Sequence, residues 1–289
     1  MPIKESELIL NPDGSVYHLN LKPEHIADTI IFVGDQDRVA KISKHFDKIE
    51  FETQKREFKT HTGIYKGKRL TVISTGIGTD NIDIVINELD ALVNIDFEKR
   101  EIKKELSSLK IIRIGTSGSI QKDIPVDSFL ISEFATGFDS LLHFYKSDHI
   151  QYQDISDALI LHTNWSKNKS APYVVKSNSE LHKKMSSSKT HNGFTATNVG
   201  FYGPQGRILR LPVQDNELND KLATFNYKGI SITNLEMETA GVYGLAALLG
   251  HKAISLNAII ANRPNGNFSK NPKLTVERLI EYTLDKLVE

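Results

Sequence analysis

Arginines and glycine-bearing loops come together at two points in this sequence. Three apolar segments run into loops that carry glycine, at residues 33–35, 74–78 and 114–118. Arg38 follows the first loop and Arg113 precedes the third. Glycine lets backbone N–H groups approach an anion, and the planar guanidinium of arginine matches phosphate oxygens. The pattern predicts a site for free phosphate or for the anionic part of a small substrate, with Arg56 as a third candidate. Glycine turns and surface ion pairs are the simpler alternative.

A pair of carboxylates marks a second candidate site. Glu236 and Glu238 lie two residues apart where a predicted strand passes into a predicted helix. At such a junction both side chains can point into a pocket at the end of the strand, where a carboxylate can accept two hydrogen bonds from a sugar diol. The alternative is that both acids only stabilise the helix start, where the macrodipole favours negative charge.

The segment 201–207 carries side chains suited to a planar heterocycle. Gln205 can donate and accept hydrogen bonds at once, which fits the alternating edge of a uracil-like base. Arg207 can donate to a base oxygen, and Phe201 can stack on the ring. The alternative is an ordinary surface turn built on the Gly-Pro pair of this segment.

Alternating strand and helix patterns position these residues and predict an α/β fold. We expect one domain over residues 1–289, with a central mixed twisted sheet flanked by helices. Predicted strands cover residues 29–33, 58–65, 70–75, 109–114, 128–138, 173–176, 195–201, 230–234 and 253–261. Predicted helices follow residue 35, begin at Thr79 or Asp80, and cover 237–249 and 274–288. Residues 99–110 are charge-rich and expected to be solvated, and 143–169 are expected to be irregular and exposed.

Composition excludes several classes of protein. Lys+Arg and Asp+Glu both number 36, so there is no excess positive charge for a nucleic acid. The chain has no cysteine, which rules out disulfides, thiolate metal sites and cysteine nucleophiles. It has neither a P-loop nor a dinucleotide-binding glycine motif. No signal-peptide core or membrane-spanning run occurs, so no membrane partner and a cytoplasmic location are expected.

Seven segments, taken in order, resemble the nucleoside phosphorylase superfamily and, within it, the uridine phosphorylases. They are residues 16–19, 34–39, 56–58, 74–78, 113–118, 201–207 and 236–238. The Gln-Gly-Arg run at 205–207 is the segment most specific to the pyrimidine branch. The resemblance implies phosphorolysis of uridine, with deoxyuridine and thymidine as further candidates, to free base and pentose 1-phosphate. Inorganic phosphate is then the co-substrate and no other cofactor is required.

The resemblance also assigns roles to individual residues. The implied catalytic residues are Arg113, Glu238, Gln205 and Arg207. Phosphate would contact Gly34, Arg38, Arg113 and Thr116, joined by Arg56 of a neighbouring subunit. Ribose would lie on Glu236, Met237 and Glu238, with His18 reaching its 5′-hydroxyl across a dimer interface. The base would contact Phe201, Gln205, Arg207, Ile260 and Ala261, with Arg263 supporting O4 through water. Replacing Arg113 by alanine is expected to abolish turnover and leave the fold intact.

Because the resemblance places residues of two subunits in one site, it implies a homodimer, or a hexamer built as a trimer of dimers. Glu57 resembles a residue at a monovalent-cation site, such as one for K+, between subunits. The family often has a proline-serine pair after the 74–78 loop, whereas residues 79–81 here are Thr-Asp-Asn, a departure that weakens the potassium assignment.

Other functions on the same scaffold are a purine nucleoside phosphorylase, a hydrolase-like member and a non-catalytic nucleoside-binding protein. Purine-specific relatives often carry an aspartate after the last strand to protonate the base, and residues 261–264 contain none. This difference favours a pyrimidine leaving group. The arginines and glutamates together favour an enzyme over a sensor, because a sensor need not bind phosphate and ribose at once.

Overall fold

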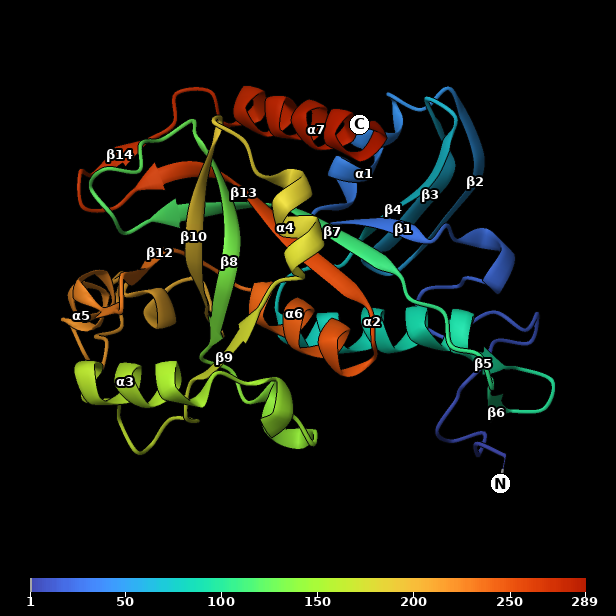
Figure 1. The fold of residues 1–289 in the computed structure, drawn as a ribbon, viewed down its shortest axis with the longest axis horizontal. Coiled ribbons are helices and arrows are strands. Elements are labelled where there is room, and N and C mark those ends of the chain that lie inside the picture. Colours follow the sequence, from blue (N-terminus) through green and yellow to red (C-terminus); the bar gives the residue numbers. More distant parts are fainter. Residues whose placement is uncertain (1) are drawn as a thin grey trace.

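A twelve-stranded mixed sheet runs through the centre of the computed structural model, which describes residues 2–289 (Figure 1). The strand order is β11-β12-β10-β8-β13-β7-β1-β4-β3-β2, with β9 beside β8 and β14 beside β13. Because β12 also pairs with β7, a ring of paired strands closes through β7, β13, β8, β10 and β12. The predicted α/β fold with a mixed central sheet is confirmed, whereas the ring was not predicted.

The elements have the following bounds. The strands of the large sheet are β1 Thr29–Val33, β2 Lys48–Lys55, β3 Phe58–Tyr65, β4 Lys68–Ser74, β7 Lys110–Ser119, β8 Phe129–Gly137, β9 Tyr173–Lys176, β10 Thr190–Thr197, β11 Asn226–Tyr227, β12 Ile230–Glu236, β13 Lys252–Asn262 and β14 Asn267–Phe268. The α-helices are α1 Gln36–Ser43, α2 Thr79–Asn94, α3 Gln153–Thr163, α4 Ser179–Met185, α5 Leu218–Thr224, α6 Thr239–Leu248 and α7 Pro272–Val288.

Strand β1 shows how the layers are held together. Its side chains alternate between the two faces of the sheet, as in any extended strand. Ile30 and Phe32 pack into a core shared with α2 and α6, whereas Ile31 and Val33 pack into a core shared with α1 and α7. The whole strand is buried because helices cover both faces, and this explains its continuous apolar run.

Residues 143–169 were wrongly expected to be irregular and exposed. They contain α3, whose Ile155 and Leu159 are buried in a third core with α5 and the end of β10. Leu161 on the same helix is 84% exposed, so apolar residues lie on two sides of α3 and the helical pattern is blurred in the sequence. Residues 101–108 are exposed as expected. They begin with β6 Glu101–Ile102, which forms a short hairpin with β5 Ile95–Asp96.

Two further boundaries differ from the prediction and affect the site. Strand β7 continues to Ser119 and does not end before the glycines at 115 and 118. A Cβ atom at Gly115 would lie 2.1 Å from Arg113 Nη1, so glycine here makes room for the arginine side chain. Strand β10 ends at Thr197, which leaves Phe201 in a loop. Helix α2 begins at Thr79, as predicted, and the preceding Gly78 has no side chain to cap it.

Every helix in residues 2–289 is too short or too polar to span a bilayer.

Candidate active site

A cavity of about 890 Å³ opens where the carboxyl ends of β1, β4, β7, β12 and β13 meet the 201–207 loop. Most of the predicted site residues line it. From the predicted set these are Gly34, Arg38, Glu57, Arg113, Thr116, Phe201, Gln205, Arg207, Glu236, Met237, Glu238, Ile260 and Ala261. Residues that are distant in the sequence are therefore brought to one place by the strand ends, as expected for ligand sites in α/β folds.

A buried charge cluster forms the floor of the cavity. Arg113 Nη2 lies 2.5 Å from Glu238 Oε2 and 3.0 Å from Glu236 Oε2. Burial alone would lower the pKa of Arg113, but the two carboxylates raise it overall, so its positive charge is secure. Arg113 Nη1 lies 3.2 Å from both Ser255 Oγ and Asn257 Oδ1, which fixes the plane of the guanidinium.

Ser255 and Asn257 were missed by the sequence reading. They lie two residues apart in an otherwise apolar part of β13 and so share one face of the strand. A polar pair at that spacing in a buried strand was the signal that could have revealed them, because buried polar groups need partners. In the fold their partner is Arg113.

The two glutamates have different roles in the structure. Glu236 accepts hydrogen bonds from Thr197 Oγ1 at 2.6 Å and from the backbone N–H groups of Glu238 and Thr239 at the start of α6. It therefore performs the helix-start role that was the simpler alternative in the sequence. Glu238 binds Arg113 and accepts the backbone N–H of Gly78 at 2.9 Å. Burial raises the pKa of Glu238, and the charge of Arg113 opposes that rise.

Arg38 supplies a second positive charge without a carboxylate partner. Its Nη1 donates to the backbone carbonyl of Ile114 at 3.2 Å, and it forms no ion pair within residues 2–289. Burial and the nearby charge of Arg113 lower the pKa of Arg38. Two guanidinium groups that repel each other across a cavity favour an anion between them. Arg38 and Arg113 line the same cavity, and their role in binding phosphate stays a prediction.

The loop side of the cavity is formed by Gln205, Arg207 and Phe201. The Gln205 side chain is buried, and its Oε1 accepts a hydrogen bond from Arg207 Nη1 at 2.6 Å. Arg207 also donates to the carbonyl of Phe201, and its guanidinium lies 3.9 Å from the centre of the Phe201 ring. Because Arg207 occupies Oε1, the amide group of Gln205 is left as a donor. Gly206 adopts a positive φ of 68°, which the turn requires.

Three predicted residues do not line the cavity within this chain. His18 Nδ1 lies 2.6 Å from Glu88 Oε1 on α2, and Arg56 is exposed, with its guanidinium 5.8 Å from the centre of the Tyr17 ring. Arg263 donates to the backbone carbonyl of Gln205 and so supports the loop from outside. Its predicted role toward the base through water stays a prediction. His18 and Arg56 were predicted to act in a neighbouring subunit, and that stays a prediction.

The cavity also contains residues that the sequence reading did not select. They are Asp35, Gln36, Asp37, Gly76, Ile77, Asn81, Gly115, Ser117, Gly118, Leu235 and Phe268. Most of them flank a predicted site residue, so closeness along the chain was the available signal.

Within residues 2–289 no group of three or more His, Asp or Glu side chains is arranged to hold a metal ion. The monovalent-cation role of Glu57 stays a prediction.

Comparison with known proteins identifies the family. The sequence profile of the phosphorylase superfamily matches residues 28–286. The chain belongs to this superfamily. A uridine phosphorylase of Thermococcus kodakarensis is 30% identical over 261 residues, which cover 89% of this chain and 81% of the relative. A DeoD-type purine nucleoside phosphorylase of Colwellia psychrerythraea is 28% identical, with 94% of this chain and 98% of the relative covered.

Solved structures of the superfamily share the fold. A crystal structure of a Trypanosoma brucei nucleoside phosphorylase, described as showing uridine phosphorylase activity, superposes with a TM-score of 0.87 at 29% identity. The match covers 97% of this chain and 99% of the other. A Phytophthora capsici uridine phosphorylase structure gives a TM-score of 0.75 at 22% identity over 100% and 99% of the two chains. The resemblance to the superfamily is confirmed.

Proposed function

We propose that this superfamily member is a uridine phosphorylase, which converts uridine and inorganic phosphate reversibly to uracil and ribose 1-phosphate. The observation that carries the proposal is one cavity with three kinds of group: Arg38 and Arg113 for phosphate, Glu238 for the sugar, and Gln205 with Arg207 for the base. Membership of the superfamily supports the view that this protein is an enzyme that transfers a pentosyl group. The proposal of uridine as the substrate rests on Gln205 and Arg207, which would bind the base.

The geometry supports a direct displacement at the sugar. Phosphate held by Arg38, Arg113 and the Gly34 and Thr116 region would lie below C1′, and Glu238 would accept hydrogen bonds from the ribose hydroxyls. A phosphate oxygen forms the new bond to C1′ while the bond from C1′ to N1 of uracil breaks. The bonding electrons leave with the base, whose oxygens accept hydrogen bonds from Gln205 and Arg207. The resulting anion then takes up a proton.

A pyrimidine is favoured because no acid lies where a purine would be protonated. Strand β13 ends at Asn262, whose Nδ2 donates to the backbone carbonyls of Gln121 and Ile124 at 2.8 Å each and is thus directed away from the cavity. Arg263 follows and binds the Gln205 carbonyl. The similarity to DeoD-type purine enzymes makes purine nucleosides the rival substrates.

A substrate panel distinguishes these possibilities. We expect phosphate-dependent release of base from uridine to exceed release from inosine or adenosine by at least about 100-fold in kcat/KM, because a site built on buried hydrogen bonds rejects the wrong partner strongly. Thymidine and deoxyuridine are included to measure sugar preference. Faster phosphorolysis of inosine would favour the purine enzyme, base release without phosphate a hydrolase, and nucleoside binding without turnover a sensor.

Gln205 is expected to decide recognition of the base. Replacing it by leucine keeps its size but removes the donor and leaves Arg207 without its acceptor at Oε1. We expect kcat/KM for uridine to fall by about 10- to 100-fold, since removing one partner of a buried hydrogen bond costs about 1–3 kcal/mol. The KM for phosphate should change little. Asn219→Leu is the control, because Asn219 binds only the backbone carbonyl of Gln205. Equal losses in both variants would argue against side-chain recognition of the base.

Arg56 and His18 lead to a proposal about assembly. Both lie outside the cavity of their own chain, so we propose that each enters the cavity of a partner in a dimer, or in a hexamer built as a trimer of dimers. Arg38→Gln and Arg56→Ala subunits should each be inactive alone. After co-refolding they should recover about a quarter of wild-type activity, because half of randomly paired dimers then contain one intact site out of two. Activity that stays absent after verified subunit exchange would contradict shared sites.

A further inference from the structure

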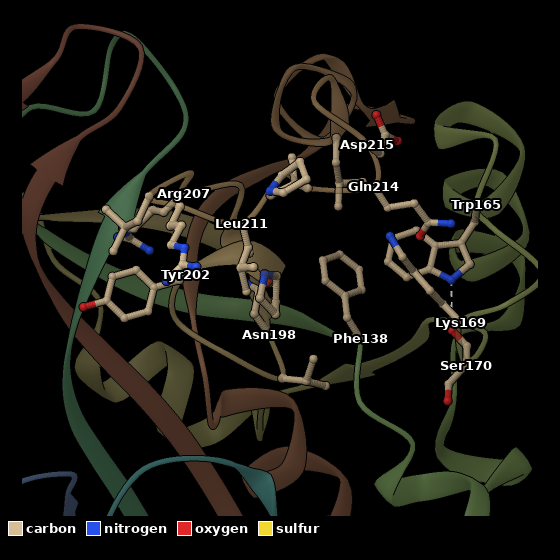
Figure 2. A pocket seen from close by; sticks show the side chains of 18 residues that line it. Phe138, Trp165, Lys169, Ser170, Asn198, Tyr202, Arg207, Leu211, Gln214 and Asp215 are labelled. Atoms are coloured by element: carbon tan, nitrogen blue, oxygen red, sulfur yellow. Dashed lines mark hydrogen bonds between the residues drawn. The ribbon is translucent and has the colours of Figure 1, made fainter.

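A second cavity of about 830 Å³ is lined in part by the 201–207 loop (Figure 2). Arg207 is the one residue that lines both this cavity and the candidate active site. The rest of the lining comes from Phe138 just after β8, the loop after α3, the 198–215 segment and Leu218 at the start of α5. The volume falls within the range of small-molecule sites. No step of the proposed phosphorolysis uses this space.

Two aromatic rings form one end of the second cavity. The Phe138 and Trp165 ring centres are 4.7 Å apart and their planes are tilted by 38°. Trp165 Nε1 donates to the Ser170 carbonyl at 2.9 Å, which holds the indole in place (Figure 2). The rings therefore present a fixed apolar surface, against which a planar ring can pack.

The opposite wall is apolar but unusually exposed. Leu209 and Leu211 are 76% and 78% exposed, and Val199 and Tyr202 beside them are 60% and 55% exposed. Several large apolar side chains that line one cavity and remain in contact with water are typical of a binding site and not of a packed core.

The charges around this cavity are mainly positive. Lys169, Arg207 and Arg210 line it, and Asp215 is the one acidic residue among its lining residues within 2–289. Asp215 is already paired with Lys221 at 3.0 Å, which together with weaker attraction from Lys169 lowers its pKa. Lys169 Nζ lies 4.9 Å from the centre of the Trp165 ring, so its charge is directed toward the aromatic end. An anion at this rim would be favoured, whereas a cation would be repelled.

We propose that this cavity binds an aromatic monoanion, a carboxylate or sulfonate attached to a fused or substituted ring. The ring would pack between Phe138, Trp165 and the leucines at 209 and 211, and the acid group would lie near Lys169 and Arg210. The apolar walls provide burial for the ring, and the excess of positive charge selects the acid. This site is separate from the proposed phosphorolysis, and its occupation does not depend on that activity.

The test uses the single tryptophan of the chain, which lies in the cavity. The probe is 8-anilinonaphthalene-1-sulfonate, titrated against the full-length protein while Trp165 quenching and probe emission are recorded. We expect saturable binding of one probe per chain. Leu211→Glu should weaken it by at least about tenfold, since apolar contact is lost and a like charge is added. The control Leu161→Glu changes an exposed leucine on α3 outside the cavity and should leave the affinity unchanged.

A second pair of measurements tests the charge selection. Lys169→Gln combined with Arg210→Gln should weaken the sulfonate probe about tenfold and leave binding of the neutral analogue N-phenyl-1-naphthylamine unchanged. Arg210 is exposed and Lys169 is half-buried, and neither is in the buried core, so the variant is expected to fold. The proposal is overturned if Leu211→Glu has no more effect than Leu161→Glu. It is also overturned if the neutral analogue binds wild type as tightly as the sulfonate, or if uracil with phosphate displaces the probe.

Discussion

Arg38→Gln is expected to lower kcat/KM for phosphate by about 100- to 1000-fold, the typical loss when a preorganised donor to developing charge is removed. The guanidinium of Arg38 has no carboxylate partner in residues 2–289, and its recorded side-chain hydrogen bond is the one to the Ile114 carbonyl. Losing that bond should cost only about 1 kcal/mol in the free energy of unfolding. The variant should thus be folded and nearly inactive.

Arg278→Gln provides the matched control. Arg278 is an exposed arginine on α7 and does not line the cavity. Steady-state kinetics at varied phosphate, together with thermal unfolding, should show the loss in Arg38→Gln alone. A phosphate KM and kcat close to wild type in Arg38→Gln would remove Arg38 from the anion site.

Arg113→Met is expected to abolish turnover and also to destabilise the fold. The arginine is 6% exposed and holds two buried carboxylates, Glu236 and Glu238. Removing the positive partner of a buried ion pair leaves uncompensated charge and costs about 3–5 kcal/mol. The sequence-based expectation that the fold would stay intact after loss of Arg113 is therefore revised. Urea unfolding of the wild type and the variant measures the difference in the free energy of unfolding.

A double variant separates charge from packing. Arg113→Met with Glu238→Gln removes one of the two carboxylate charges, so it should be more stable than Arg113→Met alone. Both should be inactive. If Arg113→Met unfolds at the same urea concentration as the wild type, the buried cluster does not contribute to stability as its geometry indicates.

Much of the fold could be predicted because its strands are buried on both faces. The runs at 29–33 and 58–65 appear in the structure with the same bounds, and α6 and α7 lie within two residues of prediction. Helix α3 was missed because the exposed Leu161 disturbs its apolar spacing. The ring through β12 and β7 was missed because pairing between distant strands leaves no local pattern in the sequence.

The main functional side chains of the candidate site could be predicted from the sequence, but the contacts that hold them could not. The residue types of Arg38, Arg113, Glu238 and Gln205 indicated anion, sugar and base chemistry, and all four line one cavity. Their partners could not be predicted, because those contacts depend on the fold. For example, the backbone N–H of Gly78 donates a hydrogen bond to Glu238. Arg113 likewise donates to the side chains of Ser255 and Asn257. The same holds for the use of Glu236 at the start of α6.

The crystal structure of the protein with inorganic phosphate and uracil is the most direct test of the proposed single cavity. We predict phosphate bound by the guanidinium groups of Arg38 and Arg113, and uracil with its oxygens on the side chains of Gln205 and Arg207. Phosphate bound away from Arg38, or uracil without a contact to Gln205, would contradict the account.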